Sequence, residues 1–275
     1  MSQYVLDHHL EGEKKRLALM SQLLDPMHRR YIESLGISRD ARVLEVGCGN
    51  GSMSAWMAGR VAPHGQVVAI DLDLSLVNDA RAPGVEFRKG DVVTGPVDPG
   101  CFDFVTARAV LHHVSNAEAA IDNLVGSLRP GGIILLVEPD FLPVSVAEPM
   151  EIRTFWNGWL TWSRERGIDY HIGRTLAPRL AAHGLKEIGG AAETALYNGG
   201  SPWADYWRQT ITELRSDLVQ SGKLDDVHRG VPRSLRRPEL VDTDNRIYRR
   251  SRTCAGVRSL RALNGESDLE VATRR

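Results

Sequence analysis

The stretch VLEVGCGNGSMS at residues 43–54 constrains the fold of this chain more than any other feature. Residues 43–46 form an apolar run whose length suits one buried strand. Three glycines follow at alternate positions, Gly47, Gly49 and Gly51, and residues 53–60 are compatible with a helix. The pattern predicts a strand, a tight turn and a helix start. Such a turn suits ligand binding, because glycine lets a ligand approach the backbone and a helix N-terminus offers N–H groups to an anion.

The spacing of these glycines distinguishes two classes of cofactor. A dinucleotide-binding turn has the pattern GxGxxG, which places its third glycine at position 52. That position is Ser52, and the glycine lies at Gly51 instead, so a nicotinamide oxidoreductase is disfavoured. Glu45 precedes the turn inside the predicted strand, where a charge is costly unless it is hydrogen-bonded.

The composition is that of a globular protein. The 275 residues fit one large domain or a domain with insertions, and 42% are hydrophobic and 25% charged. The formal net charge of −1 argues against a general nucleic-acid-binding protein. No apolar run approaches the ~20 residues that span a bilayer, and the first residues lack the order of a signal peptide. The three cysteines, Cys48, Cys101 and Cys254, lie far apart and form no CxxC pair. A zinc site or a disulfide framework is therefore not expected, and a cytoplasmic location is expected.

From residue 42 the chain alternates between strand and helix patterns. Short apolar strands are predicted at residues 42–46, 66–71, 85–87, 102–107 and 132–138, and the main helices between them at residues 52–60 and 117–128. This alternation favours a parallel sheet covered on both faces. Ligands in such sheets bind at the carboxyl ends of the strands, near the reversal of strand order.

Acidic residues stand at the ends of two of these strands. Asp71 ends the second strand at a spacing from Gly47 close to that at which a carboxylate meets ribose hydroxyls. Asp91 follows Gly90 after the third strand and could accept a hydrogen bond from an exocyclic amino group such as adenine N6. Each aspartate alone equally suits an ordinary turn.

The fourth and fifth strands bring further polar groups to the same edge. Arg108 follows the fourth strand where it opens onto the cleft, and His112 and His113 come next in ARAVLHHV. Adjacent histidines without a third ligand make a poor metal site. The fifth strand, in LRPGGIILLVEPD, presents Glu138 and Asp140.

Taken together, these features resemble the class I S-adenosylmethionine (SAM)-dependent methyltransferases over residues 42–141. The matching motifs are ExGxGxG, the acidic end of the second strand, GD after the third, ARAVLHHV and LRPGGIILLVEPD. The segments YVLDHHLEGEKKRLALMSQLLDP and DYHIGRTL look like a bacterial subgroup with small-molecule and secondary-metabolite members. The resemblance implies a Rossmann-like doubly wound α/β sheet of about seven strands, the last antiparallel. It also implies SAM as cofactor and the following binding residues: Glu45, Gly47, Gly49, Gly51, Asp71, Leu72, Asp91, Val92 and Arg108.

The N-terminal residues 1–37 have a helical pattern. A stripe through Leu17, Met20 and Leu24 marks one helix, and Asp25-Pro26 is typical of the start of a second. Together with Tyr4 this segment either forms a lid over the glycine turn or packs on the sheet as a helical hairpin. Residues 38–141 are predicted to be the SAM-binding core.

After residue 141 the sequence becomes rich in tryptophan. Trp159 and Trp162 share one helical face with Phe155, which suits either an aromatic acceptor pocket or an ordinary core. Residues 142–261 are expected to add acceptor-side helices and the last strands, and residues 262–275 a flexible tail. Strand six is predicted at residues 185–196 and the last strand at 247–257, although the latter is unusually rich in arginine.

The predicted function is methyl transfer to a small-molecule acceptor, apolar or aromatic, with the methylated atom undetermined. His112 is the first candidate for a general base because the pKa of histidine lies near neutral. Tyr4 is a candidate to orient the acceptor. Neither a nucleic-acid nor a membrane partner is expected, and homo-oligomerisation stays open. The alternative is a SAM-binding protein without transferase activity.

Overall fold

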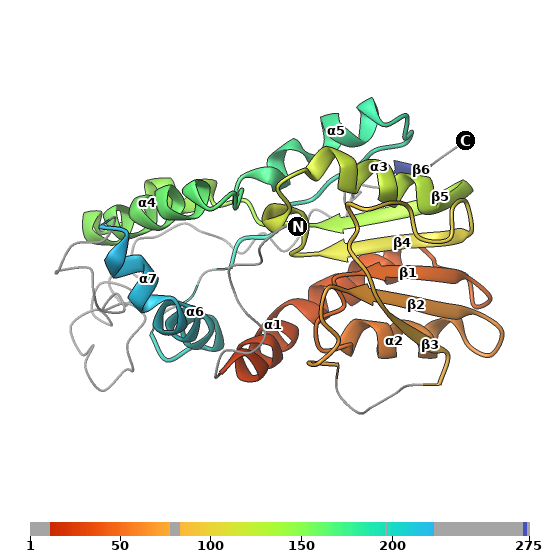
Figure 1. Ribbon diagram of the computed structural model, residues 1–275, viewed down its shortest axis with the longest axis horizontal. Coiled ribbons are helices and arrows are strands. Elements are labelled where there is room, and N and C mark those ends of the chain that lie inside the picture. Colours follow the sequence, from red (N-terminus) through yellow and green to blue (C-terminus); the bar gives the residue numbers. More distant parts are fainter. Residues whose placement is uncertain (1–11, 78–82, 196, 198, 223–271, 274–275) are drawn as a thin grey trace, which may run out of the picture.

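A sheet with five parallel strands in the order β3-β2-β1-β4-β5 forms the centre of the protein (Figure 1). The computed structural model describes residues 12–77, 83–195, 197, 199–222 and 272–273. The strands are β1 (Arg42–Val46), β2 (Gln66–Asp71), β3 (Val85–Lys89), β4 (Phe102–Arg108), β5 (Leu128–Val137) and a two-residue β6 (Ala272–Thr273), antiparallel to β5. The predicted bounds of β1 and β2 are confirmed, whereas β3, β4 and β5 are longer than predicted.

Helices cover both faces of the sheet, as its apolar strands require. Val43 of β1 packs in one core with Met57 of α2 (Ser52–Val61) and Ile32 of α1 (Glu13–Ser34). Its neighbour Leu44 points to the opposite face, where α3 (Ala117–Ser127) and α5 (Leu176–Ala182) contribute apolar side chains such as Ile121. This alternation follows from the period of two in a strand.

From Glu13 to Ser34 the chain forms one continuous helix, so the predicted break at Asp25-Pro26 is wrong. Pro26 lies inside α1, and the Asp25 side chain is buried against Arg108 and Arg29 instead of capping a second helix. The burial of His28 and Ile32 anchors the second half of α1 on the sheet. These tertiary contacts outweigh the local preference of proline to end a helix.

A second, aromatic core lies beyond the carboxyl ends of the strands. It is built by α4 (Met150–Glu165), α6 (Pro202–Glu213) and α7 (Arg215–Gln220). Of these helices, α6 lies beside α1 (Figure 1). Trp159 and Trp162 are fully buried there. Arg16 of α1 reaches the same region, where its Nη1 donates to Tyr206 Oη (3.3 Å). Within α1, Arg16 also pairs with Glu13. The tryptophans therefore form a core, and α1 joins it to the sheet.

The prediction of a sixth strand at residues 185–196 is wrong over its described part. Residues 185–195 form no strand, because Glu187 has φ +53 and residues 191–195 are exposed. The expected seven strands are not found in the described residues, and the last strand predicted at 247–257 lies outside them. Residues 272–273, predicted to belong to a tail, pair with β5. No helix within the described ranges is long and apolar enough to cross a membrane.

Candidate active site

The glycine turn after β1 has the predicted conformation. Gly47, Gly49 and Gly51 have φ of 72°, 55° and 76°, which L side chains rarely adopt. The N–H groups of Gly47 and Cys48 both donate to the carbonyl of Ile70 at the end of β2 (2.9 and 3.2 Å). The turn is therefore held against the neighbouring strand, and α2 begins directly after it.

The three glycines differ in what a side chain would meet. A Cβ on Gly47 would lie 2.2 Å from Val110 Cγ2, and one on Gly51 would lie 3.2 Å from Phe87 Cζ. A Cβ on Gly49 would meet no described heavy atom within 4 Å, because Gly49 faces a cavity. Gly47 is therefore needed for packing, whereas Gly49 leaves room for a ligand.

Glu45 supports the turn from behind. Its side chain is buried and accepts a hydrogen bond from Ser54 Oγ of α2. Burial raises the pKa of Glu45 to about 7, although the Ser54 hydrogen bond and the charge of Arg108 oppose this shift. Glu45 does not line the cavity, so its place in the structure is that of a support for the turn.

Asp71 and Asp91 both line the cavity, as the strand-end argument predicts. Asp71 Oδ2 accepts the N–H of Gly49 (2.8 Å), and Asp71 Oδ1 accepts that of Asp73 (3.3 Å). Asp91 Oδ1 accepts the N–H of Val93 (3.0 Å). Their neighbours Leu72 and Val92 complete this end of the cavity. The carboxylates are thus held by backbone N–H groups while the cavity opens beside them.

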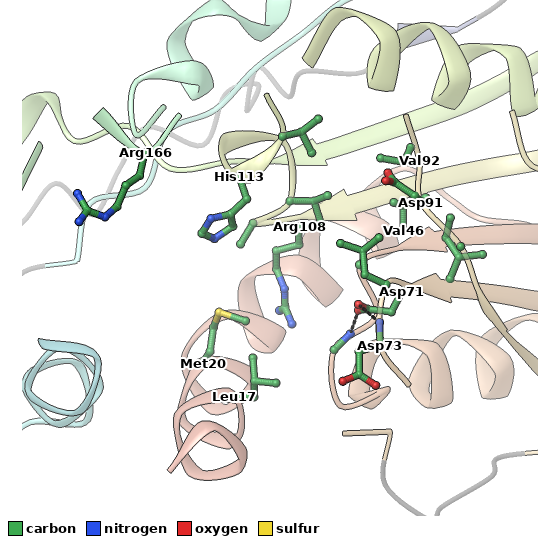
Figure 2. A pocket seen from close by; sticks show the side chains of 18 of the residues that line it. Leu17, Met20, Val46, Asp71, Asp73, Asp91, Val92, Arg108, His113 and Arg166 are labelled. Atoms are coloured by element: carbon green, nitrogen blue, oxygen red, sulfur yellow. Dashed lines mark hydrogen bonds between the residues drawn. The ribbon is translucent and has the colours of Figure 1, made fainter. Parts of the chain in front are cut away.

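The cavity has a volume of about 720 Å³ and runs from the strand ends to helix α1 (Figure 2). Leu17 and Met20 of α1 form its opposite wall, and Arg166 and Asp217 contribute from the side of the aromatic core. Ser21 Oγ of α1 also donates to Asn50 Oδ1 of the glycine turn (3.2 Å). Helix α1 therefore contacts the turn, while the tryptophans do not line the cavity within the described residues.

Arg108 lies at the end of β4 and points into the cavity. Its Nη2 is 2.8 Å from Asp25 Oδ1, and both side chains are nearly buried. Its Nη1 is buried without a hydrogen-bond partner among the described residues. Such an unsatisfied donor beside a cavity is what an anionic group of a ligand would complete.

The two adjacent histidines have different surroundings. His112 Nδ1 lies 2.8 Å from Glu138 Oε2, and Glu138 Oε1 accepts the N–H groups of Val110 and Leu111 (2.8 Å each). His113, not His112, lines the cavity. Burial and the nearby His112 and Arg16 lower the pKa of His113 well below its ordinary value, so His113 is neutral at pH 7.

Two further candidates lie elsewhere. Tyr4 is outside the described residues. Asp140 pairs with Arg174 (2.5 Å) and does not line the cavity. The part of the chain that the structure describes holds no cluster of side chains suited to a metal ion.

Sequence reasoning missed two cavity residues, Arg166 and Asp217, and the carboxylate of Asp25 that pairs with the cavity-lining Arg108. Arg166 and Asp217 come from the acceptor-side region, and Nε and Nη2 of Arg166 donate to the two oxygens of Asp217 (2.9 and 2.6 Å). No local motif marks these two residues. For Asp25 the one available signal is a charge within an apolar helical stripe, which a helix cap explains equally well.

The model of a protein family described as "Methyltransferase domain" matches residues 44–136. This segment runs from β1 to β5 and carries the glycine turn and the strand ends. Residues 44–136 therefore form a SAM-dependent methyltransferase domain. The cofactor of this domain is SAM, and the open space over Gly49 and the unsatisfied Arg108 Nη1 fit a ligand that carries a carboxylate.

Two curated proteins are similar to part of this chain. An uncharacterised 37.1 kDa protein in transposon TN4556 of Streptomyces fradiae is 33% identical over 168 residues, which are 58% of this chain and 45% of that protein. The ubiquinone/menaquinone biosynthesis C-methyltransferase UbiE of Pseudomonas putida F1 is 33% identical over 133 residues, 44% of this chain and 52% of that protein. The chain thus spans about half the length of these relatives.

A solved structure has a similar fold. Phosphoethanolamine N-methyltransferase 2 of Haemonchus contortus, in complex with phosphomonomethylethanolamine and S-adenosylhomocysteine, superposes with a TM-score of 0.53 and 14% identity. The match covers 98% of this chain and 59% of that protein. At this identity the likeness concerns the fold.

Proposed function

We propose that this protein transfers the methyl group of SAM to a small-molecule acceptor that is largely apolar or aromatic. The observation that carries this proposal is one cavity of about 720 Å³ shared by the glycine turn, the strand-end carboxylates and the wall of α1. Its volume lies in the range of roughly 300–1,000 Å³ that small-molecule sites occupy. In this proposal residues 38–141 hold the cofactor and residues 142–261 supply the acceptor side.

The cofactor roles follow the order of the strands. Gly49 gives the backbone surface for the cofactor, Asp71 accepts from the ribose hydroxyls, and Asp91 accepts from the adenine amino group. Leu72 and Val92 flank the adenine. When bound, SAM supplies a methyl group already activated by its sulfonium. The protein then has to align the reactants and exclude water, which together can lower a barrier by ~7–11 kcal/mol.

The acceptor end of the cavity favours a molecule without net charge. Leu17, Met20 and Val114 make its wall apolar. Arg166 and Asp217 neutralise each other, because two hydrogen bonds join them. The proposal leaves the methylated atom open, since one similar protein is named as a C-methyltransferase and another as an N-methyltransferase.

A general base is proposed at His112, which Glu138 orients. We expect His112→Gln to lower the single-turnover rate by about 10²–10⁴-fold. The measurement is rapid-quench kinetics with labelled SAM, after mass spectrometry of candidate metabolites has identified an acceptor.

His113→Gln is the matched control for this prediction. Because the pKa of His113 is lowered, His113 is a weak base, and its variant should keep most of the single-turnover rate even if acceptor affinity changes. A large loss of rate in His113→Gln, with a normal rate in His112→Gln, would assign proton transfer to His113 instead. Tyr4 remains the candidate for orienting the acceptor.

Two binding measurements test the proposed function itself. SAM should raise the melting temperature of the protein and NAD should not, because ligands that bind the folded state stabilise it. Stoichiometric SAM binding without turnover on any acceptor would favour the alternative, a SAM-binding protein without transferase activity.

A further inference from the structure

Arg108 uses only part of its hydrogen-bonding capacity within the described residues. Nη2 pairs with Asp25 of α1 at 2.8 Å, whereas Nη1 is buried and has no described partner. The Arg108 side chain is 10% exposed and lines the cavity. A buried guanidinium donor left unsatisfied is costly, so the site is incomplete until an acceptor fills it.

The order of the strands indicates which part of the cofactor lies near Arg108. Along the edge of the sheet, Asp91 follows β3, Asp71 ends β2, the glycine turn follows β1 and Arg108 ends β4. If adenine lies at Asp91 and ribose at Asp71, the amino-acid end of an extended SAM molecule reaches the glycine turn and Arg108. The anionic group at that end is a carboxylate.

We propose that Arg108 Nη1 donates a hydrogen bond to the methionine carboxylate of SAM, and that Asp25 is the residue that positions Arg108 for it. This inference rests on the proposed cofactor site. It adds that the packing of helix α1 is coupled to the occupancy of the cavity, because one guanidinium binds the helix through Nη2 and the cofactor through Nη1.

The surroundings of Asp25 support a positioning role. His28, one turn further along α1, is fully buried. The Thr106 hydroxyl donates to the carbonyl of Leu135, so it accepts a hydrogen bond from His28 Nε2 (2.9 Å). Burial, with the charge of Arg108, lowers the pKa of His28 to about 3. His28 is therefore neutral, and Asp25 is the carboxylate that pairs directly with Arg108.

Arg29 provides the matched control. Its Nη2 donates to the other oxygen of Asp25 (3.3 Å), but its side chain is 40% exposed and does not line the cavity. Because Arg29 is partly exposed, this contact should contribute less than the buried pair of Asp25 with Arg108. Arg29→Gln thus removes a partner of Asp25 without touching the proposed contact.

The experiment compares two ligands by calorimetry with the full chain. S-adenosylhomocysteine carries the amino-acid carboxylate, and 5′-methylthioadenosine lacks it. Arg108→Gln should weaken binding of S-adenosylhomocysteine by about 10–100-fold, the range for a charged hydrogen bond, and leave methylthioadenosine unchanged. Asp25→Asn should show the same selectivity with a smaller loss, about 3–10-fold. Arg29→Gln should bind both ligands as the wild type does.

Hydrogen exchange tests the coupling through α1. S-adenosylhomocysteine should slow amide exchange in α1 of the wild type, and this protection should be absent in Asp25→Asn. Arg108→Lys serves as the second variant if Arg108→Gln melts at a lower temperature. Equal loss of both ligands, or wild-type affinity in Asp25→Asn, would overturn the inference. A wild-type protein that binds neither ligand would instead contradict the proposed function.

Discussion

Replacing Gly49 with valine is expected to abolish SAM binding while the protein stays folded. A side chain at this position meets no described heavy atom within 4 Å, so it would fill the part of the cavity proposed for the cofactor. The φ of +55 adds strain of roughly 1–2 kcal/mol. Calorimetry with S-adenosylhomocysteine should show a dissociation constant raised more than about 100-fold, which equals about 2.8 kcal/mol.

Gly36→Val is the control that separates the effect of backbone strain from the effect of filling the cavity. Gly36 has φ +68, and a Cβ there also meets no described atom within 4 Å, but Gly36 follows α1 away from the cavity. The two variants should therefore lose similar stability in thermal melts, and only Gly49→Val should lose affinity. Equal affinities in the two variants would show that the space over Gly49 is not the cofactor site.

Glu138→Ala is expected to lower the free energy of unfolding by about 3–5 kcal/mol, because it leaves several buried donors without an acceptor. The Glu138 side chain is 0% exposed and accepts from Val110 N, Leu111 N and His112 Nδ1, each at 2.8 Å. Urea denaturation measures the change.

Glu148→Ala controls for the loss of a carboxylate as such. Glu148 pairs with Arg153 at the surface and its side chain is 72% exposed, so its loss should cost less than about 1 kcal/mol. A Glu138 variant as stable as the Glu148 variant would mean that the loop after β4 does not depend on this carboxylate.

Features that depend on neighbouring residues could be predicted from the sequence. The bounds of β1 and β2 follow from short apolar runs, and the glycine turn follows from positions that require positive φ. The placement of Asp71 and Asp91 beside the cavity follows from the shared direction of parallel strands.

Features that depend on distant partners could not be predicted. Proline at position 26 indicates a helix break, but α1 continues because its buried face packs on the sheet. The pairing of Asp25 with Arg108 joins two segments far apart in the chain, and no spacing rule connects them. Likewise, periodicity places Trp159 and Trp162 on one helical face without revealing whether that face meets a ligand or another helix.

The separation of the aromatic core from the sheet has an evolutionary consequence. Among the residues that the structure describes, the two cores that pack on the sheet share no buried side chain with the aromatic core around Trp159. A substitution in α4 or α6 therefore changes packing near the acceptor without disturbing the strands that carry the glycine turn. The family match ends at residue 136, before α4 begins at Met150. Divergence among related proteins should concentrate in the aromatic half, so that new acceptors are acquired while the cofactor half stays the same.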